Sequence, residues 1–416
     1  MLLLLLALQA PDPHLDLGPM VGHAGPSEAR IWARASGPAR LAVEWSDQED
    51  LSGSATTDAV ELTDASAFCG QVRLAPLKPA TRYWYRVLLD GRPAMARPWP
   101  AFRTAPEPGS KERVRVAFGS CVGRDGRLAA GAWGSMASQR FDLLLMLGDN
   151  HYADSTDPAK QRAAYANHRR PAGWADLCRR TPVYAIWDDH DYGPNNSDGT
   201  APGKDASLAT FKEWWANPSY GEPGHPGVYH RFRWGDVDVF MLDSRYYRTP
   251  NKAPDDGTKT MLGGRQLAWL KEGLASSTAT FKLVGCGSEF QTYTQPDGWA
   301  SFRRERDGIL DFIEREKIEG VIFLSGDRHF TAAYQIRGRH LEVTSGPLGS
   351  SNAFPKPQPE MLLLHMKGRY YTVFELDPAS RTALLEVHEA GLGVVQERLF
   401  TWAEITGAAK IPTLGR

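Results

Sequence analysis

Two textures of hydrophobic and polar positions divide this chain. In the first hundred residues, apolar and polar side chains alternate over short segments such as 29–34 and 41–45, and turn residues separate these segments. Alternation with a period of two is typical of strands that bury one face. Residues 14–104 are therefore predicted to form a small β-sandwich.

One segment of this first region adds a more specific signal. A corner containing Pro79 leads into the aromatic run Tyr83-Trp84-Tyr85. With the strand spacing, this corner resembles the fibronectin type III fold, which is a two-sheet sandwich. The segment 104–110 is rich in Pro and Gly and is predicted to be a linker.

From residue 111 the apolar runs become nearly continuous, which is typical of strands buried on both faces. Between some of these runs, the segments 264–274 and 302–316 carry apolar residues at helical spacing. Strands that alternate with helices predict a layered α/β domain, here over residues 111–400. The predicted strands cover residues 114–118, 141–147, 183–187, 237–242, 281–284, 321–324 and 341–343.

Six of these runs are followed at once by polar clusters. Ligands of α/β sheets bind beyond the carboxyl ends of the strands, so we expect these clusters to converge on one site. The clusters are Gly119-Ser120-Cys121, the segment 148–152 (GDNHY), Asp188-Asp189-His190-Asp191, Asp243-Ser244-Arg245, Gly287-Ser288-Glu289 and Gly326-Asp327-Arg328-His329.

Length and charge narrow the class of protein. The 416 residues are more than one hydrophobic core usually holds, so two domains are expected. The formal net charge is −1, so acidic and basic side chains are balanced. This balance excludes a strongly basic nucleic-acid binder and an acidic disordered chain, and no nucleic-acid-binding module is recognised. Four cysteines without a CxxC pair exclude a zinc finger and a disulfide-dense scaffold.

The start of the chain predicts export. The apolar run 2–6 is too short to cross a bilayer, and it is followed by small residues and then by Pro11. Residues 1–10 are therefore interpreted as a secretory signal segment with cleavage near Ala10, although no Lys or Arg precedes the run. No other run is long enough for a transmembrane span, so a periplasmic or secreted protein is expected. The sequence does not predict the oligomeric state.

The clustered carboxylates require positive charge nearby, because several of them cannot stay ionised together in one pocket. Arg245 and Arg328 supply too little, so bound cations are expected. Two cations suit an in-line phosphoryl displacement. The mixture of carboxylate, thiol and imidazole donors favours two different metals over a pair of magnesium ions.

The motifs resemble a known group of enzymes. Gly148-Asp149-x-x-Tyr152, Asp188-Asp189-His190-Asp191 and Gly326-Asp327-x-His329 together resemble the calcineurin-like metallophosphoesterase superfamily. Gly119-Ser120-Cys121, Trp187 before the acidic cluster, and the segments 242–248 and 261–270 point to its PhoD-like (alkaline phosphatase D) branch. The resemblance covers roughly residues 111–350. It implies a metallophosphatase β-sandwich flanked by helices, preceded by an N-terminal β-domain.

The same resemblance implies an activity and a metal centre. It implies alkaline hydrolysis of phosphate monoesters or diesters by a hydroxide or oxide that Fe³⁺ and Ca²⁺ activate, with other divalent metals as alternatives. His190 and Arg245 are the implied catalytic residues. The implied metal ligands are Cys121, Asp149, Tyr152, Asp189, Asp327 and His329, with Asp149 as the bridge.

Further residues stay open as metal or substrate contacts. Asn195 or Asn196 is a candidate ligand of calcium or phosphate, and the sequence does not choose between them. His151 is adjacent to the site, Asp188 is a candidate for orienting a ligand, and Glu289 lies near the place of a superfamily histidine that this chain lacks.

Three alternatives remain at this point. Purple acid phosphatases share the run Gly-Asp-x-x-Tyr-Ala-Asp, present here at 148–154, but they have His at the position of Asp327 and Asn at that of Asp189. A nuclease or lipid phosphodiesterase on the same fold is the second alternative. A non-catalytic binding protein with a degenerate site is the third.

Overall fold

A computed structural model describes residues 12–293 and 297–414. The predicted signal segment, residues 1–10, lies outside the described part. Within that part, no helix combines the length and the apolarity that crossing a membrane requires.

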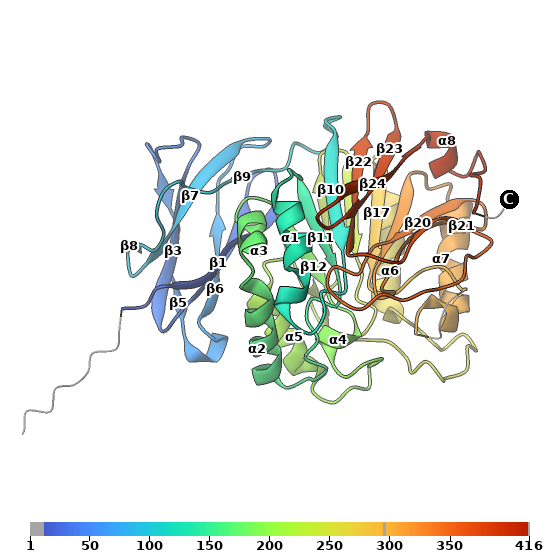
Figure 1. Ribbon diagram of the computed structural model, residues 1–416, viewed down its shortest axis with the longest axis horizontal. Helices are drawn as coiled ribbons and strands as arrows, with labels where there is room; N and C mark the ends of the chain where they lie inside the picture. Colours follow the sequence, from blue (N-terminus) through green and yellow to red (C-terminus); the bar gives the residue numbers. More distant parts are fainter. Residues whose placement is uncertain (1–11, 294–296, 415–416) are drawn as a thin grey trace, which may run out of the picture.

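The N-terminal region is a sandwich of two antiparallel sheets, as predicted (Figure 1). One sheet has the order β1-β2-β6; the other has the order β4-β3-β7-β8, with β5 beside β3 and β9 beside β7. The alternating segments of the sequence correspond to β2 and β3, and the aromatic run lies in β7. The strands are β1 (Leu15–Ala24), β2 (Ala29–Ala35), β3 (Ala39–Ser46), β4 (Ala55–Thr56), β5 (Val60–Leu62), β6 (Cys69–Leu74), β7 (Arg82–Leu89), β8 (Arg92–Pro93) and β9 (Ala101–Arg103).

Two larger sheets form the centre of the second region. The first has the order β12-β11-β10-β22-β23-β24, and its strands β10, β11 and β12 are parallel. This sheet consists of β10 (Val114–Gly119), β11 (Leu143–Leu147), β12 (Val183–Ile186), β22 (Tyr370–Asp377), β23 (Thr382–Glu389) and β24 (Gly393–Phe400).

The second central sheet has the order β15-β16-β17-β18-β20-β19-β21, with β16, β17, β18 and β20 parallel. A separate short pair consists of β13 (Gly221–Glu222) and β14 (His225–Pro226). The strands of the sheet are β15 (His230–Trp234), β16 (Val237–Met241), β17 (Phe281–Cys286), β18 (Val321–Ser325), β19 (Thr331–Ile336), β20 (His340–Thr344) and β21 (Met361–His365).

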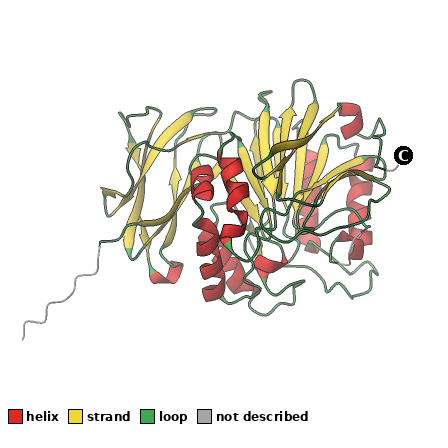
Figure 2. Ribbon diagram, viewed as in Figure 1, coloured by secondary structure: helices red, strands yellow, loops and turns green. Residues whose placement is uncertain are grey.

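Helices cover the outer faces of both central sheets (Figure 2). On the side of the N-terminal sandwich lie α1 (Ala130–Ala137), α2 (Pro158–Arg169), α3 (Ala172–Cys178) and α5 (Lys204–Trp214). The predicted helices over 264–274 and 302–316 are α6 (Gly263–Ser276) and α7 (Arg303–Arg315), whose apolar side chains pack on the second sheet. The short helices are α4 (Asp189–Tyr192), α8 (Trp402–Ile405) and the 3-10 turns η1 (Asp64–Ser66), η2 (Gly126–Ala129) and η3 (Trp299–Ser301).

A buried arginine joins the two regions. The guanidinium of Arg169, at the end of α2, lies 4.4 Å from the ring of Trp32 in the N-terminal sandwich and 4.6 Å from that of Trp215. It also donates to the carbonyl of Trp214. A cation enclosed by indole rings is strongly favoured where water is excluded. The N-terminal sandwich is thus fixed to the helices that carry the strand-end loops of the first sheet.

Candidate metal centre

The polar clusters of the sequence meet where the parallel strands of both sheets end. β10, β11 and β12 lead to the loops of Cys121, Asp149 and Asp189, and β18 leads to that of Asp327 and His329. Of these residues, Cys121, Asp149, Asp327 and His329 have positive φ angles of 61°, 52°, 66° and 55°. Non-glycine residues rarely adopt this conformation, and clusters of them are found at active sites and ligand sites.

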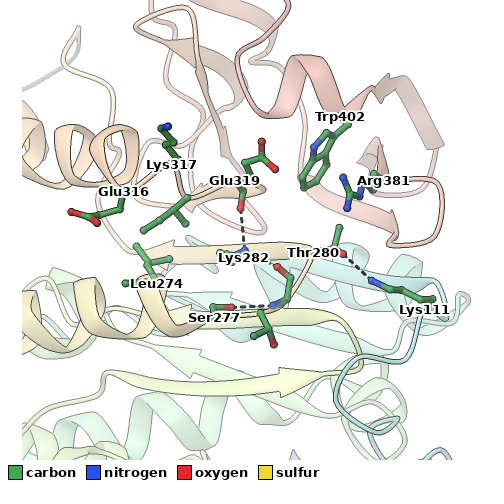
Figure 3. Close-up of a pocket in the computed structure, with 14 residues that line it drawn as sticks. Lys111, Leu274, Ser277, Thr280, Lys282, Glu316, Lys317, Glu319, Arg381 and Trp402 are labelled. Carbon is green, nitrogen blue, oxygen red and sulfur yellow. Dashed lines mark hydrogen bonds between the residues drawn. The ribbon is translucent and has the colours of Figure 1, made fainter.

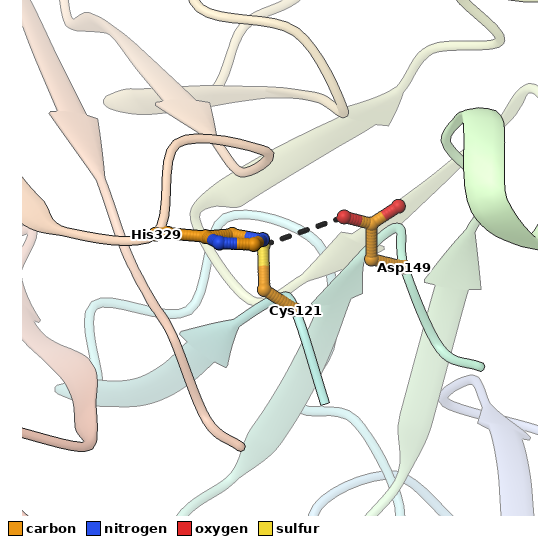
Figure 4. A group of neighbouring side chains, drawn as sticks. All are labelled: Cys121, Asp149 and His329. Atoms are coloured by element: carbon orange, nitrogen blue, oxygen red, sulfur yellow. Dashed lines mark hydrogen bonds between the residues drawn. The ribbon is translucent and has the colours of Figure 1, made fainter. Parts of the chain in front are cut away.

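Cys121, Asp149 and His329 form the first group of potential ligands (Figure 4). The Cys121 thiol donates to Asp149 Oδ2 at 3.4 Å, and the Tyr152 hydroxyl donates to the same oxygen at 3.1 Å. The Tyr152 hydroxyl also lies 3.1 Å from His329 Nε2. Sulfur, phenol, carboxylate and imidazole donors therefore face one another in a buried space, a set that suits a transition metal.

Two further groups overlap the first. Asp149 also lies with Asp189 and His190, and Asp189 lies with Asp188 and Asp327; within each group the ligand atoms are within 4.8 Å of one another. Asp149 is thus shared by two neighbouring groups, as a bridge between two cations would be. Oδ1 of Asp149 and Oδ2 of Asp188 are buried without a hydrogen-bond partner among the described residues. Such oxygens require a partner, and cations fit that requirement.

The raised pKa values of the carboxyl groups also indicate that the centre binds cations. Burial raises the pKa of Asp149 well above its usual range, and the nearby carboxylates Asp189 and Asp188 raise it further. Burial raises the pKa of Asp327 to about 8, although the Arg328 guanidinium opposes the shift. Without cations these acids hold protons that bound metal would displace.

The thiol and the phenol behave alike. Burial raises the pKa of Cys121 and that of Tyr152 well above their usual values, and the carboxylate of Asp149 adds to both shifts. Only a strongly polarising cation would ionise both groups near neutral pH. The donor set therefore fits a metal of high charge at this end of the site.

Asp191 holds the acidic loops in place. Its carboxylate accepts hydrogen bonds from the backbone N–H groups of Asp188 at 2.7 Å, Asn150 at 3.2 Å and Asp149 at 3.3 Å. Burial raises its pKa to about 8. Asp191 thus connects the loop after β11 to the loop after β12 and sets the spacing of the ligands.

The structure adds a partner for His190 that the sequence analysis did not single out. Nδ1 of His190 is hydrogen-bonded to Asp154 Oδ1, while Asp154 Oδ2 lies 2.9 Å from the guanidinium of Arg124. The ring of His190 stacks on that of Tyr152, with 4.0 Å between centroids. The signal was present in the sequence, because Asp154 closes the run Gly-Asp-x-x-Tyr-Ala-Asp at 148–154.

Arg245 lies beside the centre but is fully engaged with protein groups. Its side chain is buried, Nε donates to Asp188 Oδ1 at 2.6 Å, and Nη2 donates to Asp297 Oδ2 at 2.9 Å. Nη2 lies 3.9 Å from Asp189. This geometry favours a positioning role for Arg245 over the direct phosphate contact that the resemblance implied. Asp297 carried no sequence signal, whereas its second partner Arg248, at 2.7 Å, ends the motif segment 242–248.

The remaining candidates lie outside the three ligand groups. Glu289 is buried 3.0 Å from Arg328 and accepts a hydrogen bond from Thr344. His151 is buried with its ring edge-on to Tyr165, 4.2 Å between centroids. The side chains of Asn195 and Asn196 are exposed. Of these two residues, Asn196 contacts the site through its backbone N–H, which donates to the Asp189 carboxylate at 2.7 Å.

One of the four cysteines, Cys121, lies where it could bind a metal. All four lie in the described part of the chain, are buried and are free thiols. Burial raises the pKa of Cys69 to about 12 and that of Cys286 to about 11. Cys121 alone among them lies in a group of potential metal ligands.

Comparison with known proteins agrees with this geometry. Residues 116–367 match the PhoD-like phosphatase family, and residues 6–106 match the N-terminal domain of PhoD-like phosphatases. The chain belongs to the PhoD-like phosphatase family. This membership confirms the resemblance drawn from the sequence motifs and ranks the PhoD-like reading above the purple acid phosphatase reading.

Individual relatives of this PhoD-like chain are distant. It is 27% identical over 306 residues to alkaline phosphatase D of Bacillus subtilis (strain 168), which covers 61% of this chain and 52% of the relative. The chain thus spans about half the length of that curated relative. A solved structure of PhoD superposes with a TM-score of 0.80 at 18% identity, covering 97% of this chain and 93% of the other. A purple acid phosphatase from yellow lupin (Lupinus luteus) seeds gives 0.70 at 14% identity, covering 96% and 77%. These structures share the fold.

Proposed function

We propose that this protein is a metal-dependent phosphoric ester hydrolase of the alkaline phosphatase and phosphodiesterase type. The observation that carries the proposal is the shared position of Asp149 between two groups of potential ligands, with one of its oxygens buried and without a hydrogen-bond partner among the described residues. Family membership over both regions of the chain supports it. Two bound cations would supply Lewis acidity toward the phosphoryl oxygens and lower the pKa of an attacking water.

The proposed ligand sets follow from the donor chemistry. Cys121, Tyr152 and His329 with Asp149 suit a trivalent iron, because thiolate and phenolate are stabilised by high charge. The set made of oxygen donors suits calcium, a hard cation. It consists of Asp188, Asp189 and Asp327, and Asp149 lies beside it through the group that it shares with Asp189.

The catalytic work of the chain's own residues centres on His190. With Nδ1 held by Asp154, Nε2 is the nitrogen left to stabilise the transferring phosphoryl group or to protonate the leaving oxygen. Stacking on Tyr152 fixes the plane of the imidazole ring. Arg245 positions Asp188 and is itself fixed by Asp297. No covalent intermediate is proposed.

The proposed substrate class is a phosphate ester. An assay with one monoester and one diester determines which of the two the protein prefers. The purified protein is assayed at alkaline pH with p-nitrophenyl phosphate and bis(p-nitrophenyl) phosphate, while its metals are measured by elemental analysis. Chelation is expected to abolish turnover, and addition of Fe³⁺ and Ca²⁺ to restore it. A nuclease or lipid phosphodiesterase would turn over bis(p-nitrophenyl) phosphate, the diester of this pair, and spare the monoester.

Asp149→Asn tests the metal centre itself. Loss of the bridging carboxylate is expected to remove most of the metal and nearly all activity. Asp311→Asn, an exposed carboxylate paired with Arg337, is the matched control. Unchanged turnover in Asp149→Asn would refute the centre. Absence of turnover by the metal-loaded wild-type protein on every ester would favour the non-catalytic binding protein.

We further propose that the protein is exported. The apolar run 2–6 followed by small residues and Pro11 supports this proposal. Secretion of a reporter fused to residues 1–13 would test it, and retention of the reporter in the cytoplasm would refute it.

A further inference from the structure

A second cleft lies away from the metal centre, between the N-terminal sandwich and the first central sheet. It has a volume of about 520 Å³ and is lined by residues of β7 and β9 and by the segments that precede β11 and β12. This volume lies in the range of ordinary ligand sites. Asp142, which lines the cleft, immediately precedes β11, and Asp149 follows the same strand. At about 3.3 Å per residue, the two sites are roughly 20 Å apart.

The cleft is strongly cationic. Its lining contains one carboxylate, that of Asp142, and six arginines: Arg82, Arg103, Arg115, Arg140, Arg179 and Arg180. Three of these are paired with acids just outside the lining, namely Arg103 with Glu112, Arg115 with Glu386 and Arg179 with Asp176. Among the described residues, no carboxylate forms an ion pair with the other three, Arg82, Arg140 and Arg180.

Donors in the cleft outnumber acceptors. Within the described part of the chain, Arg180 donates only to the backbone carbonyls of Ala137 at 2.6 Å and Gln139 at 2.8 Å. Burial lowers the pKa of Arg180, and the neighbouring guanidinium of Arg140 lowers it further, so like charges are crowded here. Nε1 of Trp99 and Nε of Arg115 are buried without an acceptor among the described residues. A ligand with several anionic oxygens would neutralise the crowded guanidinium charges and would supply acceptors for the buried N–H groups.

A comparable cleft near α8 shows the contrast (Figure 3). It also carries basic side chains, but Lys282 donates to the carbonyls of Ala279 and Glu319, and Lys111 is paired with Asp236. Its lining includes the carboxylates of Glu316 and Glu319. Lys111 and Lys282 of this cleft thus have protein partners, and Lys317 and Arg381 share its lining with two carboxylates, whereas the six arginines of the first cleft share their lining with the carboxylate of Asp142 alone.

We propose that the arginine cleft binds an oligophosphate anion, that is, a ligand carrying two or more linked phosphoryl groups, either free or as part of a longer chain. The guanidinium fork matches phosphoryl oxygens, and arginines on opposite walls suit phosphates in series. This site is independent of the metal centre and of the proposed hydrolysis.

The test is isothermal titration of the metal-loaded protein with tripolyphosphate and, in a second arm, with long-chain linear polyphosphate. Orthophosphate is present at one fixed concentration in every titration to occupy the metal centre, so that its competition for the guanidinium groups is the same for all variants. Elemental analysis after titration confirms that the metals are retained. The double variant Arg82→Gln/Arg140→Gln removes two unpaired charges. The matched control Lys317→Gln/Arg381→Gln removes two charges from the cleft of Figure 3.

The cleft variant is expected to lose about tenfold or more in affinity, since it loses two charge-assisted contacts. The control is expected to retain wild-type affinity, and both variants to hydrolyse a small chromogenic ester at the wild-type rate. Binding of tripolyphosphate identifies a free oligophosphate as sufficient, and binding of the long chain alone identifies a polymer. Absence of binding in both arms, equal losses in both variants, or equal affinity for polyglutamate would overturn the proposal.

Discussion

The imidazole of His190 is held through Nδ1 by the carboxylate of Asp154, whose other oxygen lies 2.9 Å from Arg124. Asp154 lies two residues after Tyr152, so the loop that supplies a potential metal ligand also supplies the group that orients the histidine. A carboxylate on Nδ1 fixes the tautomer and the orientation of the ring. The tyrosine that is proposed to bind metal and the carboxylate that orients the proposed acid therefore share the loop after β11, whereas His190 itself lies in α4.

Asp154→Asn is expected to lower kcat by about ten- to a hundredfold, because general acid catalysis contributes about 10²–10⁴ and the variant retains His190. Metal content is expected to stay at the wild-type level, since Asp154 lies outside the ligand groups. Steady-state kinetics with elemental analysis measures both quantities. Wild-type kcat in Asp154→Asn would remove His190 orientation from the mechanism, and Asp311→Asn serves again as the control.

Arg245→Met is expected to lower the stability of the fold and to disturb the carboxylates of the metal site. It would leave the buried carboxylates of Asp188 and Asp297 without their shared cation, which costs about 3–5 kcal/mol of unfolding free energy. Thermal or denaturant unfolding measures this loss, and Arg265→Met at an exposed ion pair is the control. If Arg245→Lys instead raised KM with unfolding unchanged, Arg245 would contact substrate directly.

Tyr152→Phe is expected to remove a visible absorption band of the iron-loaded protein, because a phenolate bound to iron(III) gives a charge-transfer transition. The hydroxyl of Tyr152 lies among Asp149, His329 and Ser350, and Phe preserves the ring that stacks on His190. Tyr334→Phe, a buried tyrosine bonded to Glu289, is the control and should keep the band. A wild-type protein without the band and without iron would show that another metal occupies this end.

Metal removal is expected to destabilise the protein more at alkaline than at acidic pH. The folded-state pKa values of Asp191 and Asp327 are raised to about 8, so the metal-free fold binds protons that the unfolded chain releases above about pH 4. Stability of the chelated protein therefore falls as the pH rises from about 4 to about 8. Bound cations reverse this cost, because they replace the protons.

Melting temperatures with and without chelator, measured at pH 5.5 and pH 8.5, test this dependence. The difference between loaded and chelated protein should be larger at pH 8.5. An equal difference at both values would mean that the carboxylates are balanced by groups other than cations. Asp149→Asn protein, expected to lack most metal, should show little response to the chelator at either pH.

Much of this protein follows from local patterns in its sequence. Continuous apolar runs predicted the buried strands, and the polar residues that end them were predicted to meet, because parallel strands place their carboxyl ends at one edge. The helices α6 and α7 began and ended within about two residues of their predicted bounds, since amphipathic spacing is a local property. The motifs around Asp149, His190 and His329 were sufficient to indicate the family.

The tertiary structure decided what depends on partners distant in the sequence. Arg245 was interpreted as a phosphate ligand until its burial against Asp188 and Asp297 favoured a positioning role, and Glu289 was open until it was found against Arg328. The arginine cleft brings together Arg82 and Arg140, which no local pattern connects. A charge acts on whatever the folded chain brings within a few ångströms, and the near-zero net charge of the sequence is an average over that arrangement. The sequence thus determined the kinds of groups at the strand ends, and folding determined which of those groups are free to bind a ligand.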